Sequence, residues 1–159
     1  IYQELAPQFE KKQDWIYYYK CLIETAWALD FGGNNPQALQ AIETTIQDYY
    51  TRQPTNYHQG KLADAILIKG ILLSSADRFD EAISSFKKAY ERYALLEEGD
   101  AGFEAKEKRY SFCFNNISKE YIGKRDCSNA LDYLEKAIDI KIMLLGTYDK
   151  SLLCSMCTK

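Results

Sequence analysis

Apolar side chains recur along most of this chain every three or four positions, as in α-helices that bury one face. The clearest stretch, 62–94, reads LADAILIKGILLSSADRFDEAISSFKKAYERYA. It predicts two amphipathic helices joined by a tight turn at 76–79. Small residues stand where these helices must touch, at Gly70, Ala82 and Ala89. The bulky apolar residues around them are Ile66, Leu73, Phe79, Ile83, Phe86 and Tyr90.

The same spacing predicts a hairpin on either side, so that three hairpins span 14–50, 61–96 and 103–145 within a single all-α domain. In the first, Asp14 is predicted to cap the opening helix. Gly32 and Gly33 end that helix, because glycine readily adopts the left-handed conformation of a helix stop. Asn35 is predicted to cap the next helix, with Pro36 at its first position. The turn of the third hairpin is predicted at 123–126.

Two short segments flank the hairpins. Pro7 is expected to interrupt a helix, so 1–13 is either the tail of a preceding helix or a lead-in arm. Residues 150–159 are expected to start a further helix. Because the chain begins at Ile1 without Met and stops within that expected helix, we expect a fragment of a longer protein.

The three hairpins align on the alanine that comes after each turn. These alanines are Ala38, Ala82 and Ala130, at intervals of 44 and 48 residues (82 − 38 and 130 − 82). Small residues recur twelve positions before them (Ala26, Gly70, Ser118) and seven after them (Thr45, Ala89, Ala137). Two helices approach within roughly 8–10 Å of each other where their side chains are small. The chain is therefore predicted to be a repeat array.

These positions resemble the tetratricopeptide-repeat family across roughly 14–150. Ala82-x3-Phe86 matches the family's A-x3-F, and Gly70 matches its glycine, with Ile66 and Leu73 in place of Trp and Tyr. The long-repeat variety of kinesin light chains is similar at 137–141 (AIDIK) and at Leu145-Gly146, although Asp149-Lys150 stands where that variety has His-Pro. The resemblance implies a right-handed superhelical stack of antiparallel helix hairpins, an α-solenoid of about three repeats with partial flanking helices.

In such repeats the first helix of each pair lines a concave groove that holds a partner's peptide or helix. The resemblance assigns to this groove the residues 15 and 11 positions before each reference alanine: Ile23, Trp27, Leu67, Ile71, Asn115 and Lys119. Positions 18 and 8 before it add Lys20, Asp30, Asp64, Ser74, Phe112 and Ile122.

The groove residues distinguish between ligand classes. A clamp for a carboxylate needs charged or amide donors, whereas the first two hairpins place Ile23, Trp27, Leu67 and Ile71 there. We therefore expect an apolar groove that suits an amphipathic helix or a partly apolar peptide. Trp27 is the expected hot spot, because buried Trp anchors dominate many interfaces. The alternative is that Trp27, Leu67 and Ile71 pack against a neighbouring repeat or a terminal segment.

Charge and composition narrow the classes of partner that we expect this chain to bind. The formal charge of −3 and the lack of any basic run argue against a nucleic-acid surface. No apolar run is long enough to cross a membrane, so we expect no membrane insertion. Five cysteines, an odd number, suit free thiols in a reducing, cytoplasmic compartment.

Candidate chemistry is sparse. Cys154-x-x-Cys157 has the only metal-like spacing, but structural zinc needs four ligands and no second pair exists. The one histidine, His58, lies in a polar loop and leaves little for nucleophilic catalysis. We therefore expect no metal, no cofactor and no enzyme activity.

The sequence thus favours a protein–protein interaction module, a scaffold or adaptor that binds a protein or peptide partner in its groove. One alternative is a peptide-sensing regulatory domain that controls an attached effector domain. The other is an architectural part of a large ciliary or transport assembly, with neighbouring repeats of the same longer chain as its contacts.

Overall fold

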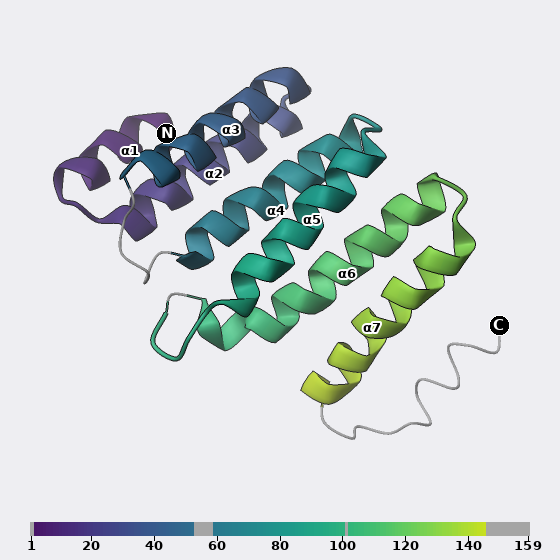
Figure 1. The fold of residues 1–159 in the computed structure, drawn as a ribbon. Coiled ribbons are helices and arrows are strands. Elements are labelled where there is room, and N and C mark those ends of the chain that lie inside the picture. The colour runs from purple at the N-terminus through teal and green to yellow at the C-terminus, as the bar shows by residue number, and fades with distance from the viewer. Residues whose placement is uncertain (1, 53–58, 101, 146–159) are drawn as a thin grey trace.

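The computed structural model describes residues 2–52, 59–100 and 102–145 of this 159-residue chain. Within these ranges every regular element is helical (Figure 1). The elements are α1 (Tyr2–Lys11), α2 (Trp15–Phe31), α3 (Asn35–Arg52), α4 (Gln59–Ser75), α5 (Phe79–Ala94), the 3-10 turn η2 (Phe103–Ala105), α6 (Lys106–Gly123) and α7 (Cys127–Leu145).

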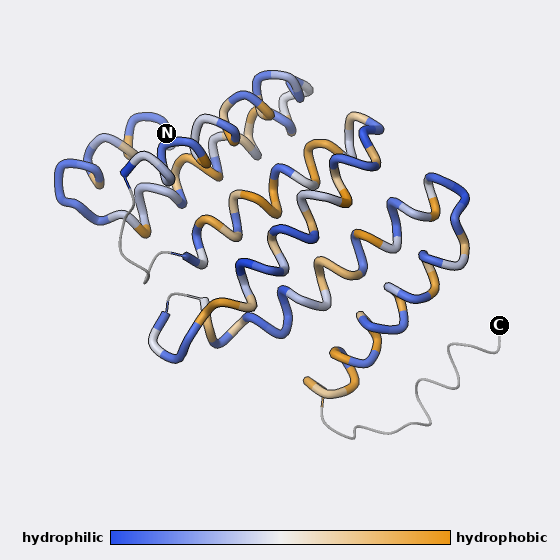
Figure 2. Tube along the Cα trace, viewed as in Figure 1, coloured by the Kyte–Doolittle hydropathy of each residue, from blue (hydrophilic) through white to orange (hydrophobic). Residues whose placement is uncertain are grey.

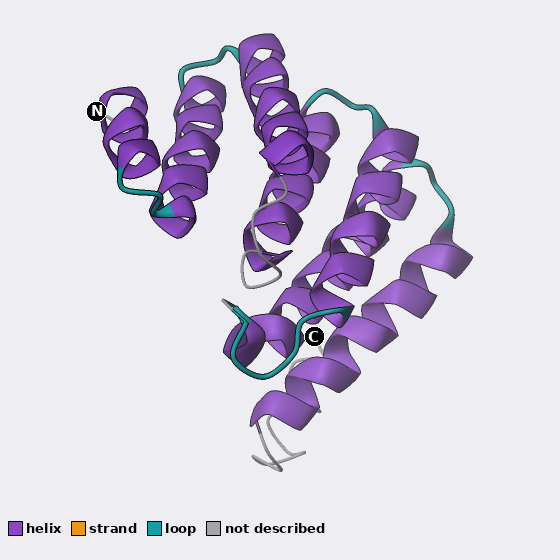
Figure 3. Ribbon diagram, turned by 60° about the vertical axis from the view of Figure 1, so that its left-hand side comes forward, coloured by secondary structure: helices purple, strands orange, loops and turns teal. Residues whose placement is uncertain are grey.

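The helices pack in chain order, each mainly on its neighbours in sequence (Figures 1 and 3). Among the first helices of successive pairs, α4 also contacts both α2 and α6. The predicted all-α stack of adjacent helix pairs is therefore confirmed. The further helix expected at 150–159 lies outside the described residues. The right-handed sense of the superhelix and the division into the ranges 14–50, 61–96 and 103–145 stay predictions.

In all three pairs the first helix ends at the same distance from the reference alanine. The first helices α2, α4 and α6 all end seven residues before the reference alanine, at Phe31, Ser75 and Gly123. The longer second interval therefore arises between hairpins, where α5 ends at Ala94 and α6 begins only at Lys106. The insertion in the repeat lies in a loop, and the packed helices keep their register.

Four turns between helices are closed by the same backbone hydrogen bond. In each, the residue just before the next helix donates its N–H to the carbonyl five residues earlier at 2.9–3.0 Å: Asp14 to Phe9, Asn34 to Leu29, Arg78 to Leu73 and Asp126 to Tyr121. The residue before each donor has a positive φ: Gln13, Gly33, Asp77 and Arg125. This closure satisfies carbonyls at the end of the preceding helix and fixes where the next helix starts.

The helix caps agree with the sequence in one case and correct it in another. Asp14 accepts a hydrogen bond from the Tyr17 N–H at 3.4 Å, which confirms the predicted cap. The prediction that Asn35 caps α3 is wrong, since Asn34 accepts from the Gln37 N–H at 3.3 Å. The Asn35 amide instead donates to the Leu72 carbonyl of α4 at 3.0 Å. This contact with the next hairpin uses the side chain that local spacing assigned to the cap.

The expectation that Pro7 interrupts a helix is also wrong. Pro7 lies inside α1, on its exposed side. Ala6 is buried, and Leu5 and Phe9 pack against the same core cluster. Packing of this apolar face on α2 offsets the one intrahelical hydrogen bond that proline removes.

Small residues bring paired helices together in two different ways. A Cβ placed on Gly70 would lie 2.6 Å from the ring of Phe86, which is fully buried, so α4 and α5 approach through a glycine. In the next pair the hydroxyl of Ser118 donates to the Ala130 carbonyl at 2.7 Å, and that of Ser111 donates to the Ala137 carbonyl at 3.1 Å. The helices α6 and α7 are therefore joined through buried hydroxyl groups.

Candidate partner-binding groove

The first helices enclose a pocket of about 340 Å³ on the side of the stack formed by α2, α4 and α6. Helix α4 contacts both α2 and α6, which places the three first helices next to one another. The lining residues are Lys20, Ile23, Glu24 and Trp27 of α2, Lys61, Asp64, Leu67 and Ile68 of α4, and Arg109 of α6. We call this pocket the groove.

Three of the six predicted groove residues meet in it. Ile23, Trp27 and Leu67 line the groove from α2 and α4. Ile23 and Leu67 are buried, with only 2% of Leu67 exposed, so they form the floor. Trp27 is half-buried, so part of its ring stays open to the groove.

The other three predicted residues lie elsewhere. Ile71 is half-buried and packs against both core clusters. Asn115 and Lys119 are exposed on α6 and do not line this pocket. The structure therefore brings Ile23, Trp27 and Leu67 together and leaves Ile71 and the α6 pair outside the groove.

The rim of the groove is charged, and Asp64 organises it. Its carboxylate accepts a hydrogen bond from the Tyr93 hydroxyl at 2.7 Å and pairs with Lys61 at 3.0 Å and with Arg109 at 3.3 Å. Burial, followed by the charge of Asp64, raises the pKa of Tyr93 well above its ordinary value. One carboxylate therefore ties α4, α5 and α6 together at the groove.

This network leaves the groove with a positive balance. Lys20, Lys61 and Arg109 face Glu24 and Asp64, which is a net charge of +1 over the lining residues (3 − 2). Lys20 is exposed, so its ammonium is available to a ligand. The groove combines an apolar floor with a rim of mixed charge whose net charge is +1.

Farther along α4 and α6, two polar side chains join the helices. The Ser74 hydroxyl donates to Glu120 Oε1 at 2.6 Å. Glu120 is buried, and its Oε2 has no hydrogen-bond partner among the described residues. Ser74 was predicted as a flanking groove position and instead bridges the two first helices.

Four lining residues escaped the sequence reasoning: Glu24, Lys61, Ile68 and Arg109. A signal existed for two of them. Lys61 and Arg109 each lie 21 residues before the reference alanine (82 − 61 and 130 − 109). Extending the repeat alignment by one helical turn would have placed both cations beside Asp64.

Other candidate chemistry gains no support. Among residues 2–52, 59–100 and 102–145, no group of three or more His, Cys, Asp or Glu side chains is placed to hold a metal ion. No helix in this part of the chain is long and apolar enough to span a membrane. His58, Cys154 and Cys157 lie outside the described residues. Burial raises the pKa of the Cys113 thiol to about 12, which keeps it in the unreactive form.

No model of a known protein family matches this chain, and no curated protein matches it. Among solved structures, the crystal structure of MamA aligns with 91% of this chain and 91% of its own, with 18% sequence identity and a TM-score of 0.34. The case for a function therefore rests on the geometry of the chain itself.

Proposed function

We propose that this chain is a protein–protein interaction module, a scaffold or adaptor that binds a peptide or helix of a partner in the groove between α2, α4 and α6. The observation that carries the proposal is the groove itself, in which successive first helices contribute side chains to one pocket. An extended array of helix pairs typically offers its concave surface in this way.

The floor supports an apolar anchor in the partner. Ile23 and Leu67 are held in place by core packing, so a ligand meets a preformed apolar surface. The half-buried Trp27 adds a large, rigid ring at one end. Such a surface suits an apolar side chain of the partner.

The rim supports an acidic group beside that anchor. Lys20 is exposed, and Arg109 and Lys61 are already paired with Asp64. A carboxylate next to the apolar anchor would complement the net positive charge, and such complementarity selects among partners and speeds their association. The proposed ligand is therefore an amphipathic helical segment with an apolar face and an adjacent Asp or Glu.

The test uses a displayed library of helical peptides, each about four turns long, in which apolar and acidic positions vary. Peptides selected on the wild-type chain are measured by titration calorimetry against Trp27→Ala and Lys20→Glu. We expect Trp27→Ala to weaken binding by at least about tenfold, as for an interface hot spot. Lys20→Glu should weaken acidic peptides several-fold, with a larger loss at low salt.

Lys88→Glu is the matched control for charge reversal, because Lys88 is exposed on α5 and does not line the groove. It should leave affinity unchanged. Circular dichroism of each variant checks that the fold is intact. If the selected peptides bind all three variants as tightly as the wild type, or shift NMR signals only outside α2, α4 and α6, the groove is not the binding site.

A further inference from the structure

A second pocket, beside the groove, lies between α1 and α2. Its volume is about 480 Å³, and its lining residues are Tyr2 of α1 and Glu24, Trp27, Ala28 and Phe31 of α2. Spacings of three, one and three residues place the four α2 residues on one face of that helix. We call this pocket the aromatic pocket.

Three aromatic side chains form its walls. Phe31 is 88% exposed and Tyr2 43%, whereas Trp27 is half-buried. The ring centroids of Trp27 and Phe31 lie 6.2 Å apart at an interplanar angle of 41°, so the two rings are not stacked on each other. Ala28, on the same face, contributes only a methyl group. Large apolar side chains gathered at an exposed position in this way mark a binding surface.

The charge of the aromatic pocket is negative. Glu24 is the one charged residue among those that line it, and none of the ion pairs within the described residues involves it. In the same part of the chain, no Lys or Arg lies over the ring of Tyr2, Trp27 or Phe31. Because the faces of aromatic rings attract cations, the pocket suits a cation that a ligand supplies.

A neighbouring part of the chain shows how such groups hold a guanidinium. The Cζ atom of Arg52 lies 5.4 Å from the ring centroid of Trp15 and 5.5 Å from that of Tyr18. Its nitrogen atoms pair with Asp48 Oδ1 and Glu10 Oε1, each at 2.7 Å. Aromatic rings and carboxylates from α1, α2 and α3 thus surround one arginine. The aromatic pocket offers the same two kinds of group to an arginine from outside.

The corresponding face of α4 has a different character. Fourteen and ten residues before the reference alanine, α4 has Ile68 and Leu72 (82 − 68 and 82 − 72), both buried in a cluster with residues of α2. Figure 2 shows hydrophobic residues recurring along α4. The same positions on α2 hold Glu24 and Ala28 (38 − 24 and 38 − 28). Because burying an unpaired carboxylate is costly, this face of α2 favours a charged ligand over the apolar side of another helix.

We propose that the aromatic pocket binds the side chain of an arginine in a partner protein. A guanidinium is planar and stacks on aromatic faces, and it donates two parallel hydrogen bonds to a carboxylate such as that of Glu24. A lysine ammonium lacks both features. The inference goes beyond the function proposed for the groove, because Tyr2 and Phe31 line only the aromatic pocket.

The test is an NMR titration of the full chain with the tripeptide Gly-Arg-Gly, blocked at both ends. We expect saturable shifts of the Trp27 indole N–H signal and of the amide signals of residues 28–31. Three further peptides replace the arginine by lysine, by leucine or by citrulline, which is neutral and has the same planar shape. The citrulline peptide should bind about tenfold more weakly, because it loses both the ion pair and the cation–π contact.

Two variants assign the binding to the pocket. Glu24→Gln removes the charge and should weaken the arginine peptide about fivefold. Phe31→Leu keeps an apolar side chain but removes the ring, and should weaken it about two- to fivefold. The matched controls Glu91→Gln and Phe112→Leu change the same residue types at exposed positions on α5 and α6, outside both pockets. They should leave the affinity unchanged, and circular dichroism checks that every variant is folded.

Four results would overturn the proposal. The first is an arginine peptide that causes no saturable shift at these signals. The second is a lysine or citrulline peptide that binds as tightly as the arginine peptide. The third is equal binding of the leucine peptide, which would make the pocket a purely apolar docking surface. The fourth is a shift of the same signals on dilution of the chain alone, which would show that a second copy covers the pocket.

The outcome is separable from that of the groove. Phe31 lies outside the groove, so Phe31→Leu should leave binding of the library-selected helical peptides unchanged. A chain that binds the arginine peptide but selects no helical peptide would retain the aromatic pocket and refute the groove. The reverse result would refute the aromatic pocket alone.

Discussion

In both the α4–α5 pair and the α6–α7 pair the two helices approach closely, but different side chains make the contact. The α4–α5 contact is apolar around Gly70, because this glycine lets the Phe86 ring fill the space between the helices. The α6–α7 contact is partly polar, because Ser111 and Ser118 bond to carbonyls of α7. The position of Phe86 is taken there by Leu134, which is only half-buried.

The difference arises from position in the stack. The α4–α5 pair lies between α3 and α6, so both faces of α5 are covered. In α7 only Ala130 and Ala137 are buried. Where a helix has neighbours on both sides, large apolar side chains bury most of their surface. Among the described residues, α7 packs mainly on α6, and buried hydroxyl bonds make part of that contact.

The two pairs should differ most in stability when the residue four positions after the reference alanine is truncated to alanine. Phe86→Ala should lower the free energy of unfolding by about 3–5 kcal/mol, because it removes a fully buried ring and leaves a cavity. Leu134→Ala should cost about 1–2 kcal/mol, since part of that side chain is already in solvent. Urea unfolding of both variants measures the difference between these two losses of free energy. Equal losses would mean that α7 is as well covered as α5.

A smaller loss is expected when the close approach of α4 and α5 is obstructed. Gly70→Ala gains about 1 kcal/mol of helix propensity. Its Cβ, however, meets the buried Phe86 ring at 2.6 Å, and overpacking of this kind costs about 1–3 kcal/mol. We expect net destabilisation in thermal unfolding. Gly123→Ala is the milder comparison, since its Cβ would lie 3.1 Å from Phe79, and net stabilisation by Gly70→Ala would contradict the tight contact.

Much of this fold was predictable because it is encoded in side-chain size at fixed spacing. Gly70, Ala82 and Ala130 mark helix approaches that depend on small residues alone, so the sequence was enough to align the hairpins. The cap of α3 was not predictable in the same way. Asn34 and Asn35 are equivalent as local caps, and the choice between them depends on the Leu72 carbonyl, 37 residues away in sequence.

The groove was predicted in part for a similar reason. Ile23, Trp27 and Leu67 face it because helical spacing fixes which side of α2 and α4 they occupy. Its charged rim depends on Asp64 meeting both Arg109 of α6 and Tyr93 of α5. These contacts join three helices. Only the recurrence of Lys61 and Arg109, 21 positions before the reference alanine, signals them in the sequence, so the predicted apolar character described only the floor.

The polar contact of the α6–α7 pair gives a third prediction. Ser118→Ala should lower the free energy of unfolding by about 1 kcal/mol, the net value of one buried hydrogen bond. Ser84→Ala, at an exposed position on α5, is the control and should change it little. Hydrogen exchange at the α7 amides shows whether the loss of stability affects this helix. An unchanged stability would show that the hydroxyl is dispensable for helix contact.

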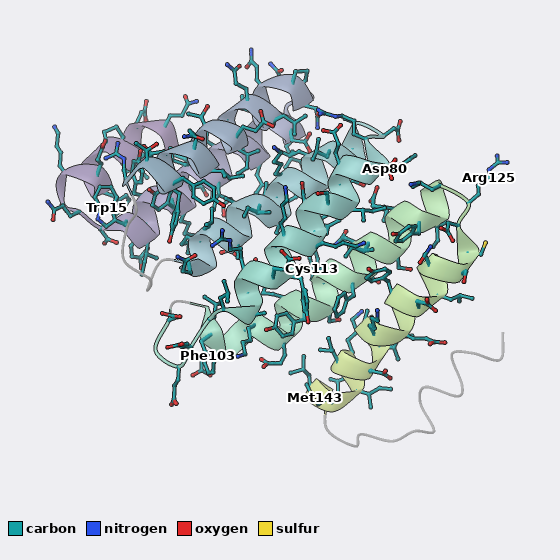
Figure 4. The ribbon with its side chains drawn as sticks, viewed as in Figure 1. Trp15, Asp80, Phe103, Cys113, Arg125 and Met143 are labelled. Carbon is teal, nitrogen blue, oxygen red and sulfur yellow. The ribbon has the colours of Figure 1, made fainter. Side chains whose placement is uncertain are left out.

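The smallest expected effects concern the turns within the two pairs. Arg125 adopts φ +61 at a solvent-exposed corner (Figure 4), so Arg125→Gly should stabilise the α6–α7 pair by about 0.5–1 kcal/mol. Asp77 has φ +57 in the α4–α5 turn. Because Asp tolerates this conformation better, Asp77→Gly should stabilise the α4–α5 pair by less. Differential scanning calorimetry resolves the two shifts, and a lower melting temperature for Arg125→Gly would contradict the strain argument.

The strictly sequential packing of the helices also has a consequence for how the chain folds. Each helix finds its main partner one step along the sequence, so no large loop must close before stable contacts form. Proteins dominated by such local contacts fold quickly, and repeat arrays grow from any stable unit to its neighbours. The well-covered α4–α5 pair is the natural nucleus, from which order spreads in both directions. Synthesis and folding of this chain can therefore proceed together, one helix pair at a time.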